Sequence, residues 1–418
     1  MIEIISRPTV VRGLSPTESW YAALGAYVGY AVEVRGRLDV DALTTALEAV
    51  RHSYPVLAAR LDQVGDQRVV VTGTEPLPGV SVVSVGTADP SAPLTGFDVD
   101  PRDGVSAVHV VHDGDRAIVA LVIHHAIADG HHAIAVLEDF WACYTDAVQG
   151  RATVLPVHGY PDAIEKILSN RGIGDFEYPV PPARQPAGRA ADTADLPVFT
   201  NQLVRCEFGT DALLDLGHRT GVTLNALVSA AIIQAEAAER GRPVTEIPYA
   251  ITVDMRTRLT PQVAMAAGTN VISFVGFTAS EDTGSDLISL ARAVGARLPE
   301  AVEERTEIHR NAAGIHDFVD GLTRPSAPGS VLTTNWGTVP ALRSPAELTF
   351  GAFHGALYNK VQDTSVLSPS SSSSMHLYAI YSFNGTTAVE AVLGDPALHQ
   401  SARRKIAAVT SALRAHLH

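Results

Sequence analysis

The feature that most constrains the fold of this chain is a buried strand that leads directly into two histidines and then into a helix. Residues 117–123 are almost wholly apolar, as expected of a strand covered on both faces. His124 and His125 follow at its carboxyl end, and apolar residues recur at helical spacing over 131–148, behind Asp129. The pattern therefore predicts a rigid unit that presents an imidazole, which can accept a proton near neutral pH.

The first part of the chain also carries a hairpin signal and an amphipathic helix. The turn at 113–115 contains Asp-Gly-Asp and predicts that a strand at 105–111 pairs with the strand that ends at the histidines. Residues 39–50 have apolar side chains at helical spacing behind the capping Asp39. Further strands are expected at 26–37 and 67–71.

A proline-rich stretch divides the chain. Five prolines lie between residues 176 and 197, where no periodicity remains. We therefore expect a domain at 1–177, a linker at 178–198 and a domain at 199–418. In the second domain we predict helices near 210–218, 223–240 and 284–304 and one after Pro396, and strands at 247–254, 270–277, 329–335, 347–353, 375–382 and 387–393. The turn Asn384-Gly385 joins the last two as a hairpin, and the run Ser370 to Ser374 is expected to be a loop. This mixture predicts an α/β (α+β) protein.

Charge and composition exclude several classes of protein. With 31 Lys and Arg against 45 Asp and Glu in 418 residues, the net charge of −14 argues against nucleic acid as a partner. Cys143 and Cys206 have no metal-site spacing and fit a reducing compartment. No apolar run approaches a membrane span, and residues 1–7 lack the pattern of a secretory leader. We therefore expect a cytoplasmic protein, and a monomer, with no transmembrane segment.

The histidine pair with Asp129 and Gly130 resembles the His-His-x-x-x-Asp-Gly signature of the superfamily of condensation domains and chloramphenicol-type acetyltransferases. Within it, the chain is most similar to the polyketide-associated acyltransferases, a standalone branch typified by phthiocerol dimycocerosyl transferase. Other stretches agree with the family pattern in order, namely 14–18, 41–43, 51–57, 253–256, 268–270 and 334–337. The resemblance therefore covers most of the chain.

The resemblance implies two chloramphenicol-acetyltransferase-like domains, each a mixed sheet flanked by helices, with a channel between them. It also implies O-acyl transfer from a thioester of coenzyme A or an acyl carrier protein to a hydroxyl group. His125 matches the general base of the family, which removes the proton of the hydroxyl as the carbonyl is attacked. No acyl-enzyme, metal or other cofactor is expected.

The family pattern also implies supporting roles for other residues. Asp129 is expected to form a salt bridge with Arg256, and thus to be structural, while His124 packs behind the site. Gly130 allows a tight turn or a close approach of the backbone. The candidates for stabilising the oxyanion are Asn335 and Trp336. Asn335 could equally satisfy backbone groups, and Trp336 could equally line the channel wall.

Three other interpretations stay open. His131 and His132 put four histidines and Asp129 within nine residues, which raises a metal site, although the first two histidines belong to a strand. A serine hydrolase would need a nucleophile, but the chain has no Gly-x-Ser-x-Gly elbow. The chain could also be a non-catalytic module that binds a carrier protein or a polyketide. Within the transferase class, the alternative is a standalone condensation-type enzyme that forms amides.

The family suggests partners but not one substrate. The acceptor is expected to be a hydroxylated polyketide, either a lipid diol or a macrocycle such as an ansamycin. The donor is an acyl-CoA or the acyl carrier protein of a polyketide synthase. An acidic carrier protein would need basic docking residues, for which the candidates are Arg292, Arg297, Arg305 and Arg310.

Overall fold

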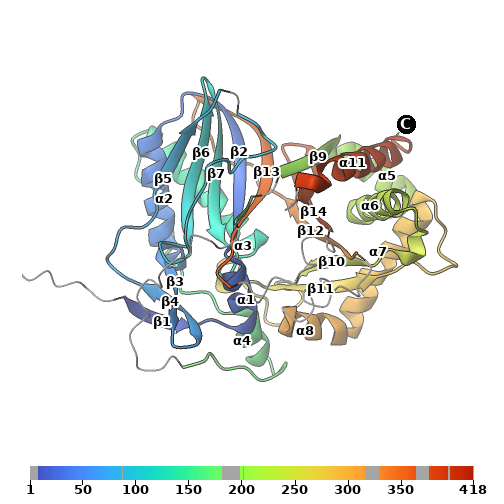
Figure 1. Cartoon of the computed structure of the whole chain (residues 1–418), viewed down its shortest axis with the longest axis horizontal. Helices are drawn as coiled ribbons and strands as arrows, with labels where there is room; N and C mark the ends of the chain where they lie inside the picture. Colours follow the sequence, from blue (N-terminus) through green and yellow to red (C-terminus); the bar gives the residue numbers. More distant parts are fainter. Residues whose placement is uncertain are drawn as a thin grey trace, which may run out of the picture. The chain divides into compact units, whose positions relative to one another are not determined.

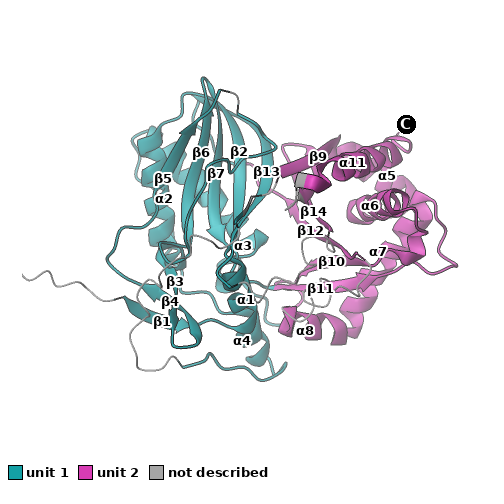
Figure 2. Ribbon diagram, viewed as in Figure 1, with its two compact units in different colours: residues 1–200, 260–271, 342–366 teal, residues 201–259, 272–341, 367–418 magenta. Residues whose placement is uncertain are grey.

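The chain forms two compact units, which Figure 2 shows in different colours. The computed structural model describes residues 8–86, 88–180, 198–200, 202–315, 329–363, 376–393 and 396–417. Unit 1 comprises Met1–Thr200, Thr260–Val271 and Leu342–Val366, and unit 2 comprises Asn201–Leu259, Ile272–Ala341 and Leu367–His418. This division differs from the contiguous domains expected at 1–177 and 199–418, because two segments of the C-terminal half belong to unit 1.

The main sheet of unit 1 explains one of these segments. Its strand order is β5-β6-β7-β2-β13-β8, with bounds Val80–Ser84, Ser106–Asp113, Arg116–His124, Ala26–Gly36, Leu348–Lys360 and Val198–Thr200. Strand β13 comes from far along the sequence and pairs antiparallel with β2, from Leu348 opposite Gly36 to Asn359 opposite Ala26 (Figure 1). The ladder of backbone hydrogen bonds thus fixes 348–360 in unit 1.

Both faces of this sheet are covered. On one face lie helices α2 (Val40–Ser53) and α3 (Gly130–Val148), with Trp141 of α3 against Phe350 of β13 at a ring distance of 4.6 Å. On the other face, Leu94 and Phe97 pack with Ala and Val side chains of the strands. All residues of β7 after Arg116 are consequently buried, as predicted for a strand covered on both faces.

A smaller part of unit 1 lies at the end of the sheet that carries the histidines. It contains the three-stranded sheet β1-β4-β3 (Thr9–Gly13, Gln67–Thr72 and Arg60–Val64). It also contains α1 (Pro16–Leu24), η1 (Pro55–Ala58), α4 (Ile164–Ser169) and η3 (Met265–Ala267). Ser15 and Glu18 form a capping box at the start of α1, with Pro16 in its first turn, which explains why the helix begins there.

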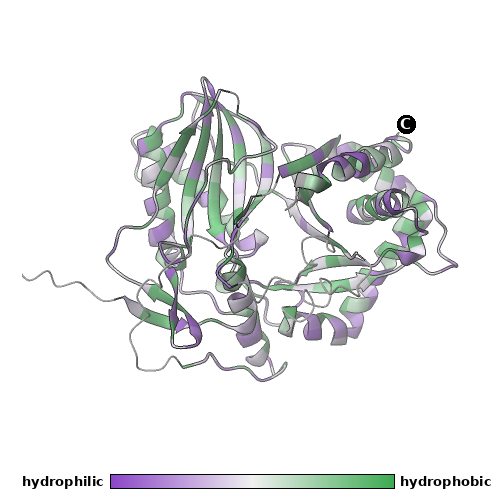
Figure 3. Cartoon of the chain, viewed as in Figure 1, coloured by the Kyte–Doolittle hydropathy of each residue, from purple (hydrophilic) through white to green (hydrophobic). Residues whose placement is uncertain are grey.

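Unit 2 is a second mixed sheet with helices packed on it. The strand order is β11-β10-β12-β14-β15-β9, with bounds Ile272–Phe277, Tyr249–Asp254, Val331–Thr338, His376–Phe383, Thr386–Leu393 and Gln202–Gly209. Its helical segments are α5 (Thr210–Thr220), α6 (Leu224–Arg240), η2 (Val244–Glu246), α7 (Leu287–Glu304), α8 (Thr306–Ala313), η5 (Pro396–Leu398) and α11 (His399–Arg414). Helices α5, α6, α7 and α11 bury their apolar sides together with one face of the sheet. In Figure 3, α8 is mostly hydrophilic.

Most of the predicted elements are present. The hairpin of β6 and β7 is confirmed, and so is that of β14 and β15, whose turn residues Asn384 and Gly385 have the positive φ angles of 48° and 76° that a two-residue hairpin turn requires. Strand β13 extends seven residues beyond the predicted 347–353. Strand β4 of the small sheet lies at the strand expected at 67–71, whereas β1, β3, β5, β9, α1, α4 and α8 were not predicted. Most of the predicted linker, the segment 1–7 and the run 370–374 lie outside the described residues.

Candidate active site

The histidine pair lies where β7 ends and the turn into α3 begins. His124 is the last residue of β7 and stands opposite Tyr27 of β2. The next backbone amide, that of His125, donates a hydrogen bond of 2.7 Å to the carbonyl of Ala26. Asp129 then caps α3, which starts at Gly130. The strand, the pair and the helix form the unit that the sequence predicts, and the backbone on both sides of the pair is fixed.

His124 is enclosed in the core of unit 1. Its side chain is fully buried, its ring meets that of Tyr27 edge-on at 4.7 Å, and its Nδ1 accepts a hydrogen bond from the Ala126 amide at 3.1 Å. Its Nε2 has no hydrogen-bond partner among the described residues. Burial, with a smaller effect of His125, lowers the pKa of His124 to about 3. His124 is therefore neutral at pH 7, which agrees with the packing role expected for it.

His125 has one defined hydrogen bond through its ring. Its Nδ1 lies 3.0 Å from Oδ1 of Asn270, and Nδ2 of Asn270 donates to the carbonyl oxygen of His125 at 2.8 Å. The second bond identifies which end of the amide carries the oxygen, so Nδ1 of the imidazole is the donor in the first. Burial lowers the pKa of His125. The ring is thus neutral near pH 7, with its free lone pair on Nε2.

An aromatic ring covers one face of the imidazole. Tyr21, from α1, stacks on His125 with 4.0 Å between ring centroids and 3° between ring planes. Trp20 meets Tyr21 edge-on at 5.0 Å. Tyr21 is buried, with 8% of its surface exposed, whereas His125 is only partly buried. The imidazole of His125 therefore has a packed side and keeps some contact with the surface.

Asp129 holds together the backbone around the site. Its Oδ1 accepts the amide of His132 at 3.0 Å, as a helix cap, and its Oδ2 accepts the amide of Val271 at 2.8 Å. Its own amide donates to the carbonyl of Thr269 at 2.7 Å. Since Thr269 and Val271 flank Asn270, these bonds also fix the residue that orients His125.

The partner expected for Asp129 belongs to the other unit. Arg256 is buried in unit 2, and its Nη1 lies 3.1 Å from Oδ1 of Asp254. The pairing of Arg256 with Asp129 stays a prediction. Gly130 occupies the first position of α3.

A buried carboxylate ties α1 to the segment that carries Asn270. Glu18 accepts two hydrogen bonds from Arg12, at 2.6 and 2.8 Å, and one from the hydroxyl of Thr269 at 2.9 Å. It also accepts the amide of Ser15 at 2.9 Å. All four donors surround a side chain that is 1% exposed, so the charge of Glu18 is compensated where it is buried.

The residues expected near the oxyanion lie in β12 of unit 2. Oδ1 of Asn335 accepts the amide of Gly337 at 2.8 Å, and its Nδ2 donates to Asn225 at 2.9 Å. Trp336 sits where the pairing of β12 with β14 shifts register, and its ring stacks on Tyr381 at 5.8 Å. These contacts give the Asn335 amide a structural role, and its part in oxyanion stabilisation stays a prediction.

The described residues give little support to a metal site or to a basic docking patch. In the part of the chain that the structure describes, no group of three or more His, Cys, Asp and Glu is placed to hold a metal ion. Of the four candidate docking arginines, Arg297 forms ion pairs with Glu300 and Glu307, and Arg292 donates to the carbonyl of Thr220 at 3.2 Å. Docking through these residues stays a prediction.

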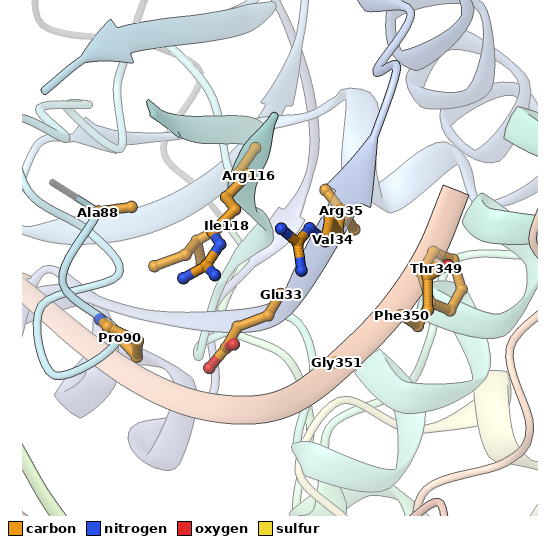
Figure 4. A pocket seen from close by; sticks show the side chains of 11 residues that line it. Glu33, Val34, Arg35, Ala88, Pro90, Arg116, Ile118, Thr349, Phe350 and Gly351 are labelled. Atoms are coloured by element: carbon orange, nitrogen blue, oxygen red, sulfur yellow. The ribbon is translucent and has the colours of Figure 1, made fainter. Parts of the chain in front are cut away.

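A hollow in unit 1 lies far from the histidines. It has a volume of about 380 Å³, and Figure 4 shows Glu33, Arg35 and Arg116 among the side chains that line it. Because Arg116 begins β7 and His124 ends it, the hollow lies roughly 25 Å from the histidine pair. The carboxylate of Glu33 is bonded to the buried His354 at 2.7 Å. The hollow and the histidine pair therefore lie at opposite ends of β7.

Two residues of this site have no assigned role in the sequence analysis. Asn270 appears there only as part of a stretch that agrees with the family, and Tyr21 does not appear at all. The sequence does contain a signal for the helix of Tyr21, namely Ser15-Pro16 followed by Glu18, the pattern of a capping box. No local pattern indicates that either residue meets His125.

None of the helices within the described ranges is by itself long and apolar enough to cross a membrane. Only α5 and α6 taken together reach that length and apolarity, and they are bent by 93°.

Comparison with known proteins identifies similar sequences and similar structures. Residues 201–392 match the model of a family described as phthiocerol/phthiodiolone dimycocerosyl transferase C-terminus. A phthiocerol/phthiodiolone dimycocerosyl transferase from Mycobacterium sp. (strain JLS) is 30% identical over 362 residues, which cover 81% of this chain and 85% of that protein.

Two solved structures are similar over almost the whole chain. Polyketide synthase associated protein 5 from Mycobacterium tuberculosis has a TM-score of 0.76 and 24% identity, with 97% of each chain covered. The first condensation domain of the calcium-dependent antibiotic synthetase, in complex with a substrate analogue, has a TM-score of 0.63 and 15% identity, with 98% of each chain covered. The predicted fold class, two mixed sheets flanked by helices, is confirmed.

Proposed function

Because the chain belongs to the phthiocerol/phthiodiolone dimycocerosyl transferase family of acyltransferases, we propose that it is an O-acyltransferase acting on natural products. The acyl group comes from a thioester of coenzyme A or of an acyl carrier protein. The acceptor is a hydroxyl of a polyketide-type product or lipid, such as a lipid diol or a macrocycle. The relatives named for dimycocerosyl transfer to phthiocerol support a polyketide alcohol as the acceptor class.

The observation that carries the proposal is the state of the His125 ring. Its Nδ1 is bonded to Asn270 at 3.0 Å, and burial lowers its pKa, which leaves Nε2 with a free lone pair near neutral pH. An alcohol is a poor nucleophile until a base removes its proton, and a positioned base contributes about 10²- to 10⁴-fold to the rate. The partial exposure of His125 is compatible with access of the alcohol to this nitrogen.

The reaction proceeds in two steps without an acyl-enzyme. First, Nε2 of His125 accepts the hydroxyl proton while the alcohol oxygen bonds to the thioester carbonyl carbon, which gives a tetrahedral intermediate. The C–S bond then breaks, and the imidazolium returns its proton to the leaving thiolate. The products are an ester and a free thiol, and the imidazole is neutral again. Asn270 holds the ring so that the same nitrogen serves both steps.

The test is turnover by the purified chain with a panel of acyl-CoA donors from acetyl to palmitoyl and with long-chain alcohols and diols. Released thiol and the mass of the ester are measured. We expect His125→Ala to lower kcat/KM by about 10²- to 10⁴-fold with its fold retained. The matched control is His52→Ala, which removes an exposed imidazole from α2 and is expected to keep the activity.

Three outcomes would overturn the proposal. A folded His125→Ala variant that keeps full turnover would exclude His125 as the general base. Product formed only with amines, and never with alcohols, would favour the alternative of a condensation-type enzyme that forms amides. Binding of a carrier protein or polyketide without turnover of any donor would favour a non-catalytic module.

A further inference from the structure

We infer that Tyr21 is a positioning residue for His125, whose ring fixes the plane of the imidazole and stabilises the imidazolium that forms when the acceptor gives up its proton. This inference rests on the proposed function, because it assigns to Tyr21 a task that exists only if His125 is the base. The observation behind it is the parallel stack of the two rings. Their centroids lie 4.0 Å apart, and the angle between their planes is 3°.

The stack supplies a constraint that the hydrogen bond to Asn270 lacks. That bond, 3.0 Å long, restrains the position of Nδ1 but lets the plane of the imidazole pivot through small combined changes of χ1 and χ2. Contact with the flat face of Tyr21 prevents this pivot, since the two rings lie nearly parallel. Trp20 packs edge-on against Tyr21 at 5.0 Å and restrains it in turn. Nε2 of His125 is thereby held in one direction.

The stack also has an electrostatic consequence. The face of an aromatic ring is electron-rich and attracts a cation above it. Burial raises the pKa of the Tyr21 hydroxyl, so the residue acts as a neutral aromatic ring. Burial disfavours the charged form of His125, and the ring of Tyr21 offsets part of that effect once the proton has arrived.

Among the residues that the structure describes, few charged groups act on the His125 ring. Asp129 at the start of α3 favours the imidazolium, while His124 on β7 is neutral at pH 7. On α1 the charged group is Glu18, whose charge is balanced by Arg12. The segment 260–271 contributes the uncharged amide of Asn270. Tyr21 is the group in stacking contact with the ring that becomes charged.

The anchoring of α1 makes this arrangement rigid. Glu18, one turn before Tyr21, accepts two hydrogen bonds from Arg12 and one from Thr269, the neighbour of Asn270. One buried carboxylate therefore fixes both the helix that carries the stacked ring and the segment that carries the hydrogen-bonding amide. The two groups that define the orientation of His125 are tied to each other.

The experiment compares Tyr21→Phe with Tyr21→Leu in the purified chain. Phenylalanine keeps the ring, so kcat should stay within about threefold of wild type. Leucine removes it, and we expect a fall in kcat of roughly 10- to 100-fold, with KM for the donor changed much less. The acid limb of the kcat/KM profile should move to lower pH by about half a unit, because the imidazolium loses a stabilising contact. Tyr160→Leu, at an exposed aromatic of the same unit, controls for the substitution itself.

A second variant covers the case in which Tyr21→Leu does not fold. Pentafluorophenylalanine at position 21 keeps the shape of the ring and reverses the charge distribution of its face, so it should lower the pKa of His125 relative to Tyr21→Phe. NMR titration of the His125 imidazole measures this without substrate. Equal imidazole pKa values in these variants, or equal losses of activity in Tyr21→Phe and Tyr21→Leu, would overturn the inference. Full turnover by His125→Ala would instead overturn the proposed function, so the two failures are distinct.

Discussion

His125 of unit 1 and Glu236 of unit 2 are ionisable groups in opposite settings. In unit 1, His125 has a single hydrogen bond through its ring and a pKa below its ordinary value. In unit 2, the fully buried carboxylate of Glu236 accepts hydrogen bonds from donors that include Tyr378 at 2.6 Å, Lys405 at 3.0 Å and Arg240 at 2.8 Å. Burial by itself would raise the pKa of Glu236, but the bonds and charges of His376, Lys405 and Tyr378 hold it well below its usual range.

The difference is the one expected between the proposed base and a structural group. A base must keep an unused lone pair and must not be charged before the substrate arrives, so it has few partners. A carboxylate that joins helix α6 to helix α11 and strand β14 is most stabilising when every lone pair is used. Burial alone therefore does not mark a functional group. A functional group is distinguished from a structural one by the number of its hydrogen-bond partners and by the charges that they carry.

The largest expected effect is on the Glu236 cluster. Glu236→Leu leaves Lys405 and Arg240 without their shared counter-charge, and we expect the free energy of unfolding to fall by about 3 to 5 kcal/mol. Urea denaturation of the whole chain measures it. Glu239 lies one turn later in α6 and forms an ion pair with the exposed Arg404. Glu239→Gln removes this pair and should lower the free energy of unfolding by less than about 1 kcal/mol. A loss of less than 1 kcal/mol in Glu236→Leu would contradict the structural role of the cluster.

The next effect concerns the orientation of the base. Asn270→Ala removes the acceptor of Nδ1, so the imidazole can rotate or change tautomer, and kcat should fall by up to about 10²-fold. Asn270 is buried and also donates to the His125 carbonyl, so the free energy of unfolding should fall by about 1 to 3 kcal/mol in the same variant. Asn270→Asp keeps an acceptor and adds a negative charge, so the acid limb of the kcat/KM profile should move to higher pH. Unchanged kcat in a folded Asn270→Ala variant would show that the amide does not orient the base.

Lowering the pH should remove the stability contributions of His124 in unit 1 and Glu236 in unit 2 over different pH ranges. The pKa of His124 is about 3 in the folded state and near 6.5 when unfolded, so its contribution is present above pH 6.5 and is lost as the pH falls. Between pH 7 and 5 this loss is about 1 to 2 kcal/mol. The depressed pKa of Glu236 implies that its contribution is lost only below about pH 4.5.

Unfolding measured at pH 7, 5 and 4 checks this order. In His124→Gln the decrease in stability between pH 7 and 5 should shrink, whereas Glu236→Gln should keep it. The same pH dependence in His124→Gln and wild type would show that this imidazole does not titrate on unfolding.

The smallest expected effect is the loss of one donor from the cluster. Tyr378→Phe removes the 2.6 Å bond to Glu236 and leaves the cationic partners in place, so the cost should be about 1 kcal/mol. Thermal or urea unfolding measures it. A cost as large as that of Glu236→Leu would mean that the hydroxyl, and not the charges, dominates the cluster.

The sequence analysis could predict much of the fold but only part of the site. Helices and strands with strong periodicity, such as those at 131–148 and 117–123, lie close to their predicted positions. Of the small sheet β1-β4-β3 only β4 was predicted. The other two strands and the short helices were missed, because short elements carry too few residues for a period to emerge. Contiguous domains were expected because no local pattern shows that β13 pairs with β2.

By itself, the sequence determined the strand, the histidine pair and the capped helix, since these follow from alternation, helical spacing and capping within one contiguous stretch. Only the tertiary structure decided which nitrogen of His125 is free and which ring covers it. Asn270 lies 145 residues further along the chain, and Tyr21 comes from a helix near its start. Contacts of this kind depend on strand pairing and on burial between distant segments, and so no local period of the sequence encodes them.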